Sequence, residues 1–322
     1  MQWKELKARL LEAGSARLTG EPAERYIAKS AAGPGAGGKG SIFFAMGTHR
    51  VKLSLNPLSS IEIAHRGNGT AQLYFEGQLI QGRLLEPGFH CPDQAFITVT
   101  GSCIFHCQYC TVPKLGGKRK SIDEIVQMVE SVRPRIQAIS ITSGVLSSIE
   151  EEEAYVLSVV KRLASFDLPI GVSIYPTDHT PERLFDLGVV EVKFNLEAAT
   201  PGIFKKVCPG LDYDRILTVL DKSVSLFGRG RVFSNVIVGL GETDEELEAC
   251  VHNLVMRGII PVLRPLNPIA EFTGKPRPSA KRLIKFHELL SRELSSAGLD
   301  PKQALTMCSN CAGCDLVPGR EE

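Results

Sequence analysis

The chain has 322 residues, of which 43% are hydrophobic and 23% charged, and its formal net charge is +1. This is the composition of a globular protein with room for one large domain and a smaller one. The near-neutral charge excludes a general attraction to nucleic acid or anionic membranes, and no apolar run reaches the roughly 18 residues that a membrane span needs. We therefore expect neither nucleic acid nor a membrane among its partners.

Residues 1–30 are predicted to be mainly helical, because Leu6, Leu10 and Ala13 recur at helical spacing. The segment 31–39 that follows is rich in glycine. A phosphate-binding loop needs Ser or Thr after its Gly-Lys pair, but Gly40 follows Lys39 here. The composition of this segment therefore favours a flexible linker.

Residues 41–83 change to the short period of β-strands, with turn signals at Asn68-Gly69 and Glu76-Gly77. They predict a small β-rich cap, separate from the sheet that follows. Such a cap covers a site, docks a partner or is purely structural. The strand-like runs are 41–45, 51–55, 61–65, 72–75 and 79–81.

From residue 96 onward, strand and helix signals alternate. This alternation predicts an α/β fold with six parallel strands joined by right-handed crossovers, and chemistry in the loops that follow the strands. The expected strands are 96–100, 138–142, 170–174, 190–195, 232–238 and 259–263, and the expected helices are 122–132, 150–165, 181–187, 214–226, 244–256 and 278–297.

The loop after the first of these strands carries Cys103, Cys107 and Cys110. Three thiolates in one loop suit a cubane [4Fe–4S] cluster whose fourth iron stays open. A zinc site would need a fourth ligand, for which His106 lies at an awkward spacing between two of the thiols. Buried structural cysteines would not gather so closely. The loop therefore predicts a cluster that can bind a second molecule.

A second triplet, Cys308, Cys311 and Cys314, lies in the C-terminal tail. It predicts another [4Fe–4S] cluster, because zinc would again need a fourth ligand and none is visible nearby. Six of the nine thiols thus fall into two triplets, which fits metal ligation in a reducing cytoplasm better than a secreted disulfide framework. We expect the other three to be buried structural residues: Cys91, Cys208 and Cys250.

The first triplet, with the aromatic Tyr109 before its third thiol, resembles the signature of the radical S-adenosyl-L-methionine (SAM) superfamily. The resemblance implies a partial (β/α)6 barrel that binds a [4Fe–4S] cluster and SAM, with Tyr109 among the cofactor contacts. It also implies that SAM chelates the open iron and is split by an electron from the cluster into methionine and a 5′-deoxyadenosyl radical. The protein positions and shields these groups.

Two strand ends carry motifs similar to those of the biotin synthase and lipoyl synthase branch. Thr142 and Ser143 resemble part of a Thr-Ser-Val stretch and are candidate SAM contacts. The segment from Asn195 and Glu197 to residue 213 resembles a longer lipoyl synthase pattern. An amide and a carboxylate two residues apart on a strand share one face and can bind ribose hydroxyls. A helix cap and a solvated acid are the structural alternative.

The stretch 236–246 also resembles a lipoyl synthase segment, and its Thr243 predicts a capping box for the next helix. At the end of the sixth strand, Arg264 would meet a carboxylate of the cofactor or pair with an acidic neighbour. Within residues 236–246, the candidates for contact with the adenosyl group are Gly239, Gly241 and Glu242.

These resemblances imply a lipoyl synthase-type enzyme that inserts sulfur at an unactivated carbon of a protein-bound octanoyl chain, with the tail cluster as sulfur donor. The C-terminal position of the second triplet resembles the divergent two-protein (archaeal-type) lipoyl synthases. The implied partners are an octanoylated lipoyl carrier protein, a companion radical SAM protein and a low-potential electron donor such as ferredoxin or flavodoxin. We expect a helix and cap (1–94), the partial barrel (95–297) and a cluster-binding tail (298–322).

Three alternatives stay open. Another radical SAM enzyme, which forms methylthio groups, rings or carbon–carbon bonds, would use the tail cluster for electron relay or substrate binding. A non-catalytic iron–sulfur electron carrier would need no nucleoside pocket, so Asn195 and Glu197 argue against it. A zinc-stabilised scaffold would contain neither iron nor sulfide.

Overall fold

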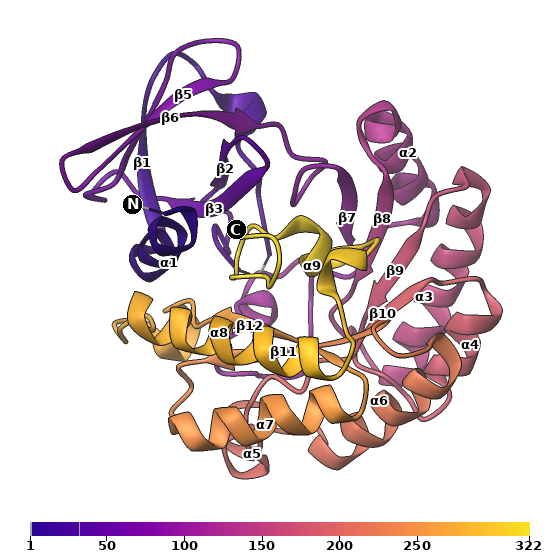
Figure 1. Ribbon diagram of the computed structural model, residues 1–322. Coiled ribbons are helices and arrows are strands. Elements are labelled where there is room, and N and C mark those ends of the chain that lie inside the picture. Colours follow the sequence, from indigo (N-terminus) through magenta and orange to yellow (C-terminus); the bar gives the residue numbers. More distant parts are fainter. Residues whose placement is uncertain (1, 32) are drawn as a thin grey trace.

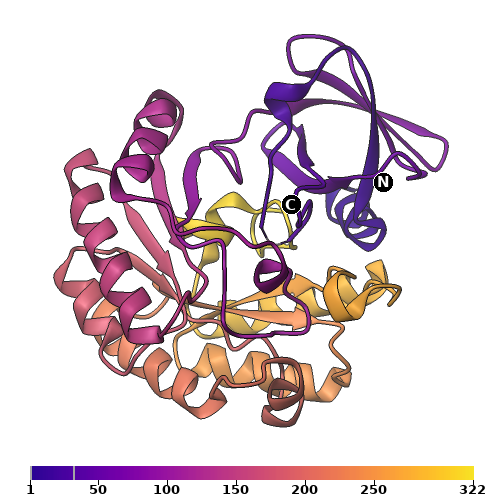
Figure 2. The ribbon, with the colours of Figure 1, turned by 180° about the vertical axis from the view of Figure 1, so that it is seen from behind.

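Two six-stranded sheets organise the chain in the computed structural model, which describes residues 2–31 and 33–322 (Figure 1). The first sheet is a closed barrel in the N-terminal part. The second is an open parallel sheet covered by helices on its outer face, as the view from behind also shows (Figure 2). The C-terminal tail lies between the two.

The N-terminal part begins with α1 (Trp3–Ala13), which ends because Gly14 adopts the left-handed conformation with φ of 70°. Strand β1 (Ser15–Gly20) follows directly and pairs with strands β3 and β4. The prediction of a mainly helical segment up to residue 30 is therefore wrong after Ala13. The strand exists because distant strands pair with it, and the local spacing of Leu6 and Leu10 contains no trace of that pairing.

The expected β-rich cap is a closed barrel with the strand order β1-β3-β2-β6-β5-β4. Its apolar interior packs against α1, and its parallel contacts are made by β1 alone. The remaining strands are antiparallel hairpins and meanders with the bounds β2 (Ser41–Met46), β3 (His49–Leu55), β4 (Glu62–His65), β5 (Thr70–Phe75) and β6 (Gln78–Leu85).

The glycine-rich segment does not form a free linker. Within residues 33–40 the backbone turns repeatedly, and the oxygen of Gly33 accepts a hydrogen bond of 3.0 Å from Asn267 Nδ2. The nitrogen of Gly35 donates to Ser54 Oγ at 2.9 Å. The segment is thus bonded both to the β-barrel and to the loop after the last strand of the parallel sheet.

The second sheet confirms the predicted α/β architecture. All neighbouring strands are parallel, in the order β12-β11-β10-β9-β8-β7, and the two outer strands do not pair, so the sheet is a partial barrel. Its strands are β7 (Gln94–Thr98), β8 (Ala138–Thr142), β9 (Ile170–Ser173), β10 (Glu191–Lys193), β11 (Val232–Val238) and β12 (Ile260–Pro265).

The helices between these strands follow the predicted order, and two short ones were not expected, α5 (Pro201–Val207) and α9 (Met307–Cys311). Thr243 forms the predicted capping box at the start of α7, together with Glu246. The others are α2 (Ile122–Val132), α3 (Ile149–Leu163), α4 (Thr180–Asp186), α6 (Tyr213–Phe227), α7 (Asp244–Met256) and α8 (Ala280–Ser296).

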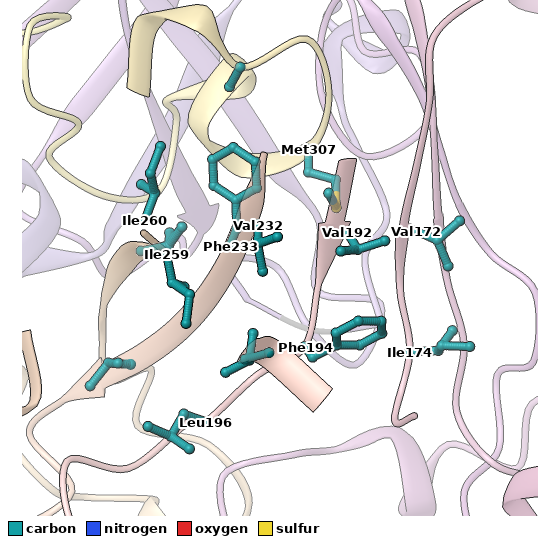
Figure 3. Close-up of a cluster of buried hydrophobic side chains, with 14 of the residues drawn as sticks. Val172, Ile174, Val192, Phe194, Leu196, Val232, Phe233, Ile259, Ile260 and Met307 are labelled. Atoms are coloured by element: carbon teal, nitrogen blue, oxygen red, sulfur yellow. The ribbon is translucent and has the colours of Figure 1, made fainter. Parts of the chain in front are cut away.

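Alternation along the strands separates the core from the site. On β10 and just beyond it, Val192 and Phe194 are fully buried in an apolar layer (Figure 3), whereas Lys193 and Asn195 line a cavity inside the barrel. Successive side chains of a strand point to opposite faces. The same strand therefore supports the helices with one set of residues and supplies polar groups to the barrel interior with the other.

The tail crosses the beginnings of the parallel strands from the inside. Gln94 at the start of β7 accepts from Met307 N (2.7 Å) and donates to Met307 O (3.1 Å). The buried Glu191 carboxylate at the start of β10 accepts from the backbone nitrogen of Thr306 at 2.9 Å. Met307 itself packs into the apolar layer of the sheet (Figure 3).

The two ends of the described chain meet in a buried ion pair. Lys7 Nζ lies 2.6 Å from Glu321 Oε1, and both side chains are 1% exposed. The same ammonium group donates to the oxygen of Ala312 at 2.7 Å. Helix α1 and the tail are therefore fastened to each other. Among the described helices, none has the length and apolar character needed to cross a bilayer.

Candidate active site

A cavity of about 330 Å³ opens inside the partial barrel, lined by strand side chains and by the loops that follow the strands. The cysteine loop forms one wall. It has no helix or strand before residue 112, but Ile104 N donates to Val145 O (2.8 Å) and Gln108 N donates to Val207 O (2.8 Å). Neighbouring loops thus hold in place the three half-buried thiols that face the cavity, Cys103, Cys107 and Cys110.

His106, the alternative zinc ligand of this loop, is exposed and does not line the cavity. In the described part of the chain, no three His, Cys, Asp or Glu side chains converge closely enough to hold a single metal ion. A cubane makes a different demand, because each thiolate binds its own iron and the ligands surround the cluster.

The end of β8 brings Thr142 and Ser143 to the same cavity. Ser143 Oγ accepts from Thr100 N (3.0 Å) and donates to Glu152 Oε1 (2.6 Å). Gly144 then lets this loop touch the cysteine loop, since a Cβ at that position would collide with the carbonyl oxygen of Ser102. The two expected SAM contacts are therefore next to the thiols in space, although Ser143 also has a structural role.

Tyr109 lines the cavity, and its hydroxyl lies 3.6 Å from Cys208 Sγ. Burial raises the pKa of Tyr109 well above its ordinary value, so its hydroxyl stays protonated. Interaction with Cys208 lowers the pKa of Cys107 below its ordinary value. Cys208 is buried, as expected for a structural residue, but it contacts a loop thiol directly, which the sequence did not indicate.

Asn195 and Glu197 follow β10 and line the cavity as predicted neighbours. Glu197 has a positive φ of 60°. It is held there by a hydrogen bond from its nitrogen to Asn235 O and by another from Ile237 N to its oxygen, both 2.8 Å. Burial raises the pKa of Glu197 to about 7, although the nearby ammonium of Lys193 lowers it. The carboxyl group is thus poised between its two forms near neutral pH.

Asn235 on β11 brings an unpaired side-chain acceptor to the cavity wall beside Asn195 and Glu197. Its backbone nitrogen donates to Asn195 Oδ1 at 3.3 Å, but its side-chain Oδ1 is buried and has no hydrogen-bond partner among the described residues. Buried polar atoms are nearly always paired. An orphaned oxygen beside an amide and a carboxylate fits a ligand that carries hydroxyl or amino donors, as SAM does.

The loop after β11 lies apart from this cavity. Neither Gly239 nor Gly241 nor Glu242 lines it. The Glu242 carboxylate accepts from the nitrogens of Gly239 (2.7 Å) and Gly241 (3.1 Å) and pairs with Arg282 at 3.0 Å. The side chain of Glu242 therefore braces its own loop, and the structure does not bring these three candidates to the other proposed SAM contacts.

Arg264 lines both the barrel cavity and the smaller cavity at the tail, and its hydrogen bond among the described residues goes to a tail thiol. Its Nη1 donates to Cys308 Sγ at 3.3 Å, and Lys193 Nζ donates to the same sulfur at 3.2 Å. Burial alone would lower the pKa of Arg264, but the thiols of Cys314 and Cys308 raise it above its ordinary value. Arg264 also lines the barrel cavity together with Asn195 and Glu197, so its contact with a carboxylate of the cofactor stays a prediction.

Cys308 connects the two triplets, because it lines the cavity inside the partial barrel together with the loop thiols. A second, much smaller cavity of about 10 Å³ lies behind it. The cysteines that line this smaller cavity are Cys91, Cys308, Cys311 and Cys314.

The site also contains residues that the sequence motifs did not identify. The sequence could have indicated Lys193, because it precedes Asn195 and Glu197 at the same spacing of two residues in the chain. Asn235 and Cys91 reach the site through strand pairing and through the path of the tail, so nothing in the local sequence marks them.

Comparison with known proteins agrees with this arrangement. Residues 97–254 match the radical SAM superfamily, and the three-thiol loop, the partial barrel and the shared cavity lie in or around this segment. The thiols and the unpaired amide oxygen fit the cluster and SAM that this family uses. The chain belongs to the radical SAM superfamily.

Within that superfamily, the chain is similar to curated lipoyl synthases. It is 29% identical to the lipoyl synthase of Cutibacterium acnes over 171 residues, which is 50% of this chain and 50% of that protein. It is 28% identical to the lipoyl synthase of Corynebacterium jeikeium over 225 residues, or 62% of this chain and 63% of that protein. The chain thus matches half to less than two thirds of the length of these relatives.

Solved structures support the fold alone. HydG, a maturase of the [FeFe]-hydrogenase, has a TM-score of 0.52 and 18% identity, covering 62% of this chain and 49% of that chain. Methylornithine synthase (PylB) has a TM-score of 0.52 and 15% identity, covering 62% of each chain.

Proposed function

We propose that this protein is a lipoyl synthase-type enzyme that inserts sulfur at an unactivated carbon of a protein-bound octanoyl chain, with a [4Fe–4S] cluster in the tail as the sulfur source. The observation that carries the proposal is the shared cavity. A substrate carbon inside it lies between the loop thiols and Cys308 of the tail. The lipoyl synthase relatives support the same chemistry.

When bound, the loop cluster and SAM supply a 5′-deoxyadenosyl radical, which takes hydrogen from carbon. Cys103, Cys107 and Cys110 would hold this cluster, and the unpaired Oδ1 of Asn235 would accept from a SAM hydroxyl or amino group. Asn195 and Glu197 would bind the ribose hydroxyls.

Apolar side chains complete the cavity and would exclude water from the reacting carbon. Phe105 of the cysteine loop, Ile237 of β11 and Leu266 after the last strand all line it. An aliphatic acyl chain suits these walls better than a polar substrate does. Thr142 and Ser143 would orient SAM from the end of β8, while Tyr109 closes the wall beside Cys107.

The proposed substrate is an octanoylated lipoyl carrier protein, and the proposed partners are a companion radical SAM protein and a ferredoxin- or flavodoxin-like electron donor. The likeness to two-protein lipoyl synthases supports the companion. The β-barrel beside the tail offers a surface for a protein substrate. We also propose a cytoplasmic location, since clustered thiols that bind iron need a reducing compartment.

The test is an anaerobic incubation with SAM, dithionite and an octanoylated carrier domain, with and without a companion protein, read by mass spectrometry of the acyl group. If the tail cluster carries sulfur-34, the label should appear in the product. Cys311→Ala should still form 5′-deoxyadenosine but give no thiolated product, whereas Cys250→Ala, which changes a buried thiol of α7, should behave as wild type. Unlabelled product, or many turnovers without loss of the cluster, would contradict sulfur donation and favour electron relay.

A further inference from the structure

A fourth cysteine lines the small cavity of the tail triplet. Cys91 lies just before β7, far from the triplet in the sequence, yet it lines the same cavity of about 10 Å³ as Cys308, Cys311 and Cys314. Cys91 is fully buried. It belongs to one small buried cluster with Cys311 of the tail and Phe43 of the β-barrel. The four cysteines therefore border the same small space inside the protein.

The backbone fixes Cys91 relative to the tail. Cys91 forms an isolated bridge with Gln94, and its oxygen accepts from Gly88 N at 2.8 Å. Gln94 in turn holds both backbone groups of Met307, the residue before Cys308. One short segment thus presents a thiol and sets the position of the helix that carries two others.

The positively charged side chains around the small cavity favour a negatively charged group inside it. Lys193 and Arg264 both donate to Cys308, at 3.2 Å and 3.3 Å. Of these two cations, Lys193 is buried and Arg264 is half-buried. Lys52 is a further buried cation, and it contacts Ser30 Oγ and the oxygen of His90 at 3.0 Å each. Buried cations need compensating charge, and Asp315 is the one carboxylate among the described residues that line the small cavity.

We propose that Cys91 is the fourth thiolate ligand of the tail cluster, so that the tail site has four cysteines where the loop site has three. The inference rests on the proposed tail cluster. A cluster held by four thiolates is anionic, which suits the three cations around it. It also has no open iron, so the tail cluster cannot bind SAM. SAM binding is thereby restricted to the loop cluster.

This ligand set also gives the tail cluster an orientation. Cys308 lines both cavities, whereas Cys91, Cys311 and Cys314 line only the small one. The iron bound by Cys308 would therefore face the substrate cavity. The iron bound by Cys91 would lie away from it, toward the β-barrel residue Phe43. Cys91 is thus a ligand that anchors the cluster on the side remote from the chemistry.

The test uses a chain that lacks the loop cluster. In a Cys103→Ala, Cys107→Ala, Cys110→Ala background, full-length protein is reconstituted anaerobically with iron and sulfide. We expect about four irons per chain, and no change in the electron paramagnetic resonance of the reduced cluster when cyanide is added, because no iron is open. A cyanide-dependent change would overturn the proposal, and this measurement does not depend on altering Cys91.

Substitution of the fourth ligand gives the complementary result. Cys91→Ser in the same background should lose one iron on mild oxidation and give a three-iron signal, which Cys250→Ser should not. Identical spectra for the two variants would exclude Cys91 as a ligand. A background protein that binds zinc, or no iron at all, would instead disprove the tail cluster and with it the proposed sulfur source, so the two failures are distinguishable.

Discussion

Replacing Glu191 by Gln should loosen the C-terminal tail from the barrel. The Glu191 carboxylate is fully buried and accepts from Leu305 N, from Thr306 N and Oγ1, and from Arg231. An amide offers one oxygen, so about two of these four donors lose their acceptor. Since a hydrogen bond to a charged group contributes about 1.5 kcal/mol or more, the attachment of the tail should weaken by about 3 kcal/mol.

Hydrogen exchange read by mass spectrometry measures this effect directly. A loss of about 3 kcal/mol corresponds to about 100-fold faster opening, which should appear in peptides that cover residues 305–317. Glu153→Gln is the matched control. Glu153 is equally buried, and its carboxylate accepts from Thr177, Thr180 and Arg183, outside the tail. Unchanged tail exchange in Glu191→Gln, or an equal increase in the control, would refute the reasoning.

Three further predictions concern the cavity inside the partial barrel. Cys107→Ala should abolish formation of 5′-deoxyadenosine from SAM, measured by liquid chromatography, while the iron of the tail stays; normal formation would disprove the loop site. Glu197→Ala should weaken SAM binding in equilibrium dialysis by about 1–3 kcal/mol, and Asn235→Ala by about 1 kcal/mol; unchanged affinity would remove either residue from the SAM site. Because burial raises the pKa of Glu197 from 4.5 to about 7, the folded apo-protein binds this proton more tightly than the unfolded chain. Its stability should therefore fall, relative to Glu197→Gln, as the pH rises from about 4.5 to above 7; a constant difference in chemical denaturation would contradict this sign.

The parallel sheet could be predicted closely because its signals are local. Helices α2 and α7 begin and end where the apolar spacing and the capping residues Ser121 and Thr243 place them. Strand β1 could not be predicted, since it depends on pairing with β3 and β4. Helix α9 is only one turn long, and its position depends on hydrogen bonds to Gln94 and Glu191.

The candidate site divides in the same way. Cys103, Cys107 and Cys110 form a motif within one loop, so spacing alone identified them. Asn235 becomes part of the site only because β10 and β11 are neighbours, and Cys91 only because the tail folds back across β7. The expected role of Glu242 illustrates the opposite limit, because a matching motif cannot tell whether a carboxylate faces a ligand or braces its own backbone.

The buried pair of Lys7 and Glu321 joins residues from the two ends of the described chain, and this has a consequence for the order of assembly. During synthesis the β-barrel and all six parallel strands emerge before the tail does, and domains tend to fold as they emerge. Contacts of such long sequence separation form late. Until residues 305–321 settle, Cys91 and the interior cations have no triplet beside them. The proposed tail cluster would therefore have to be built in this interval, because seating of the tail encloses its thiols.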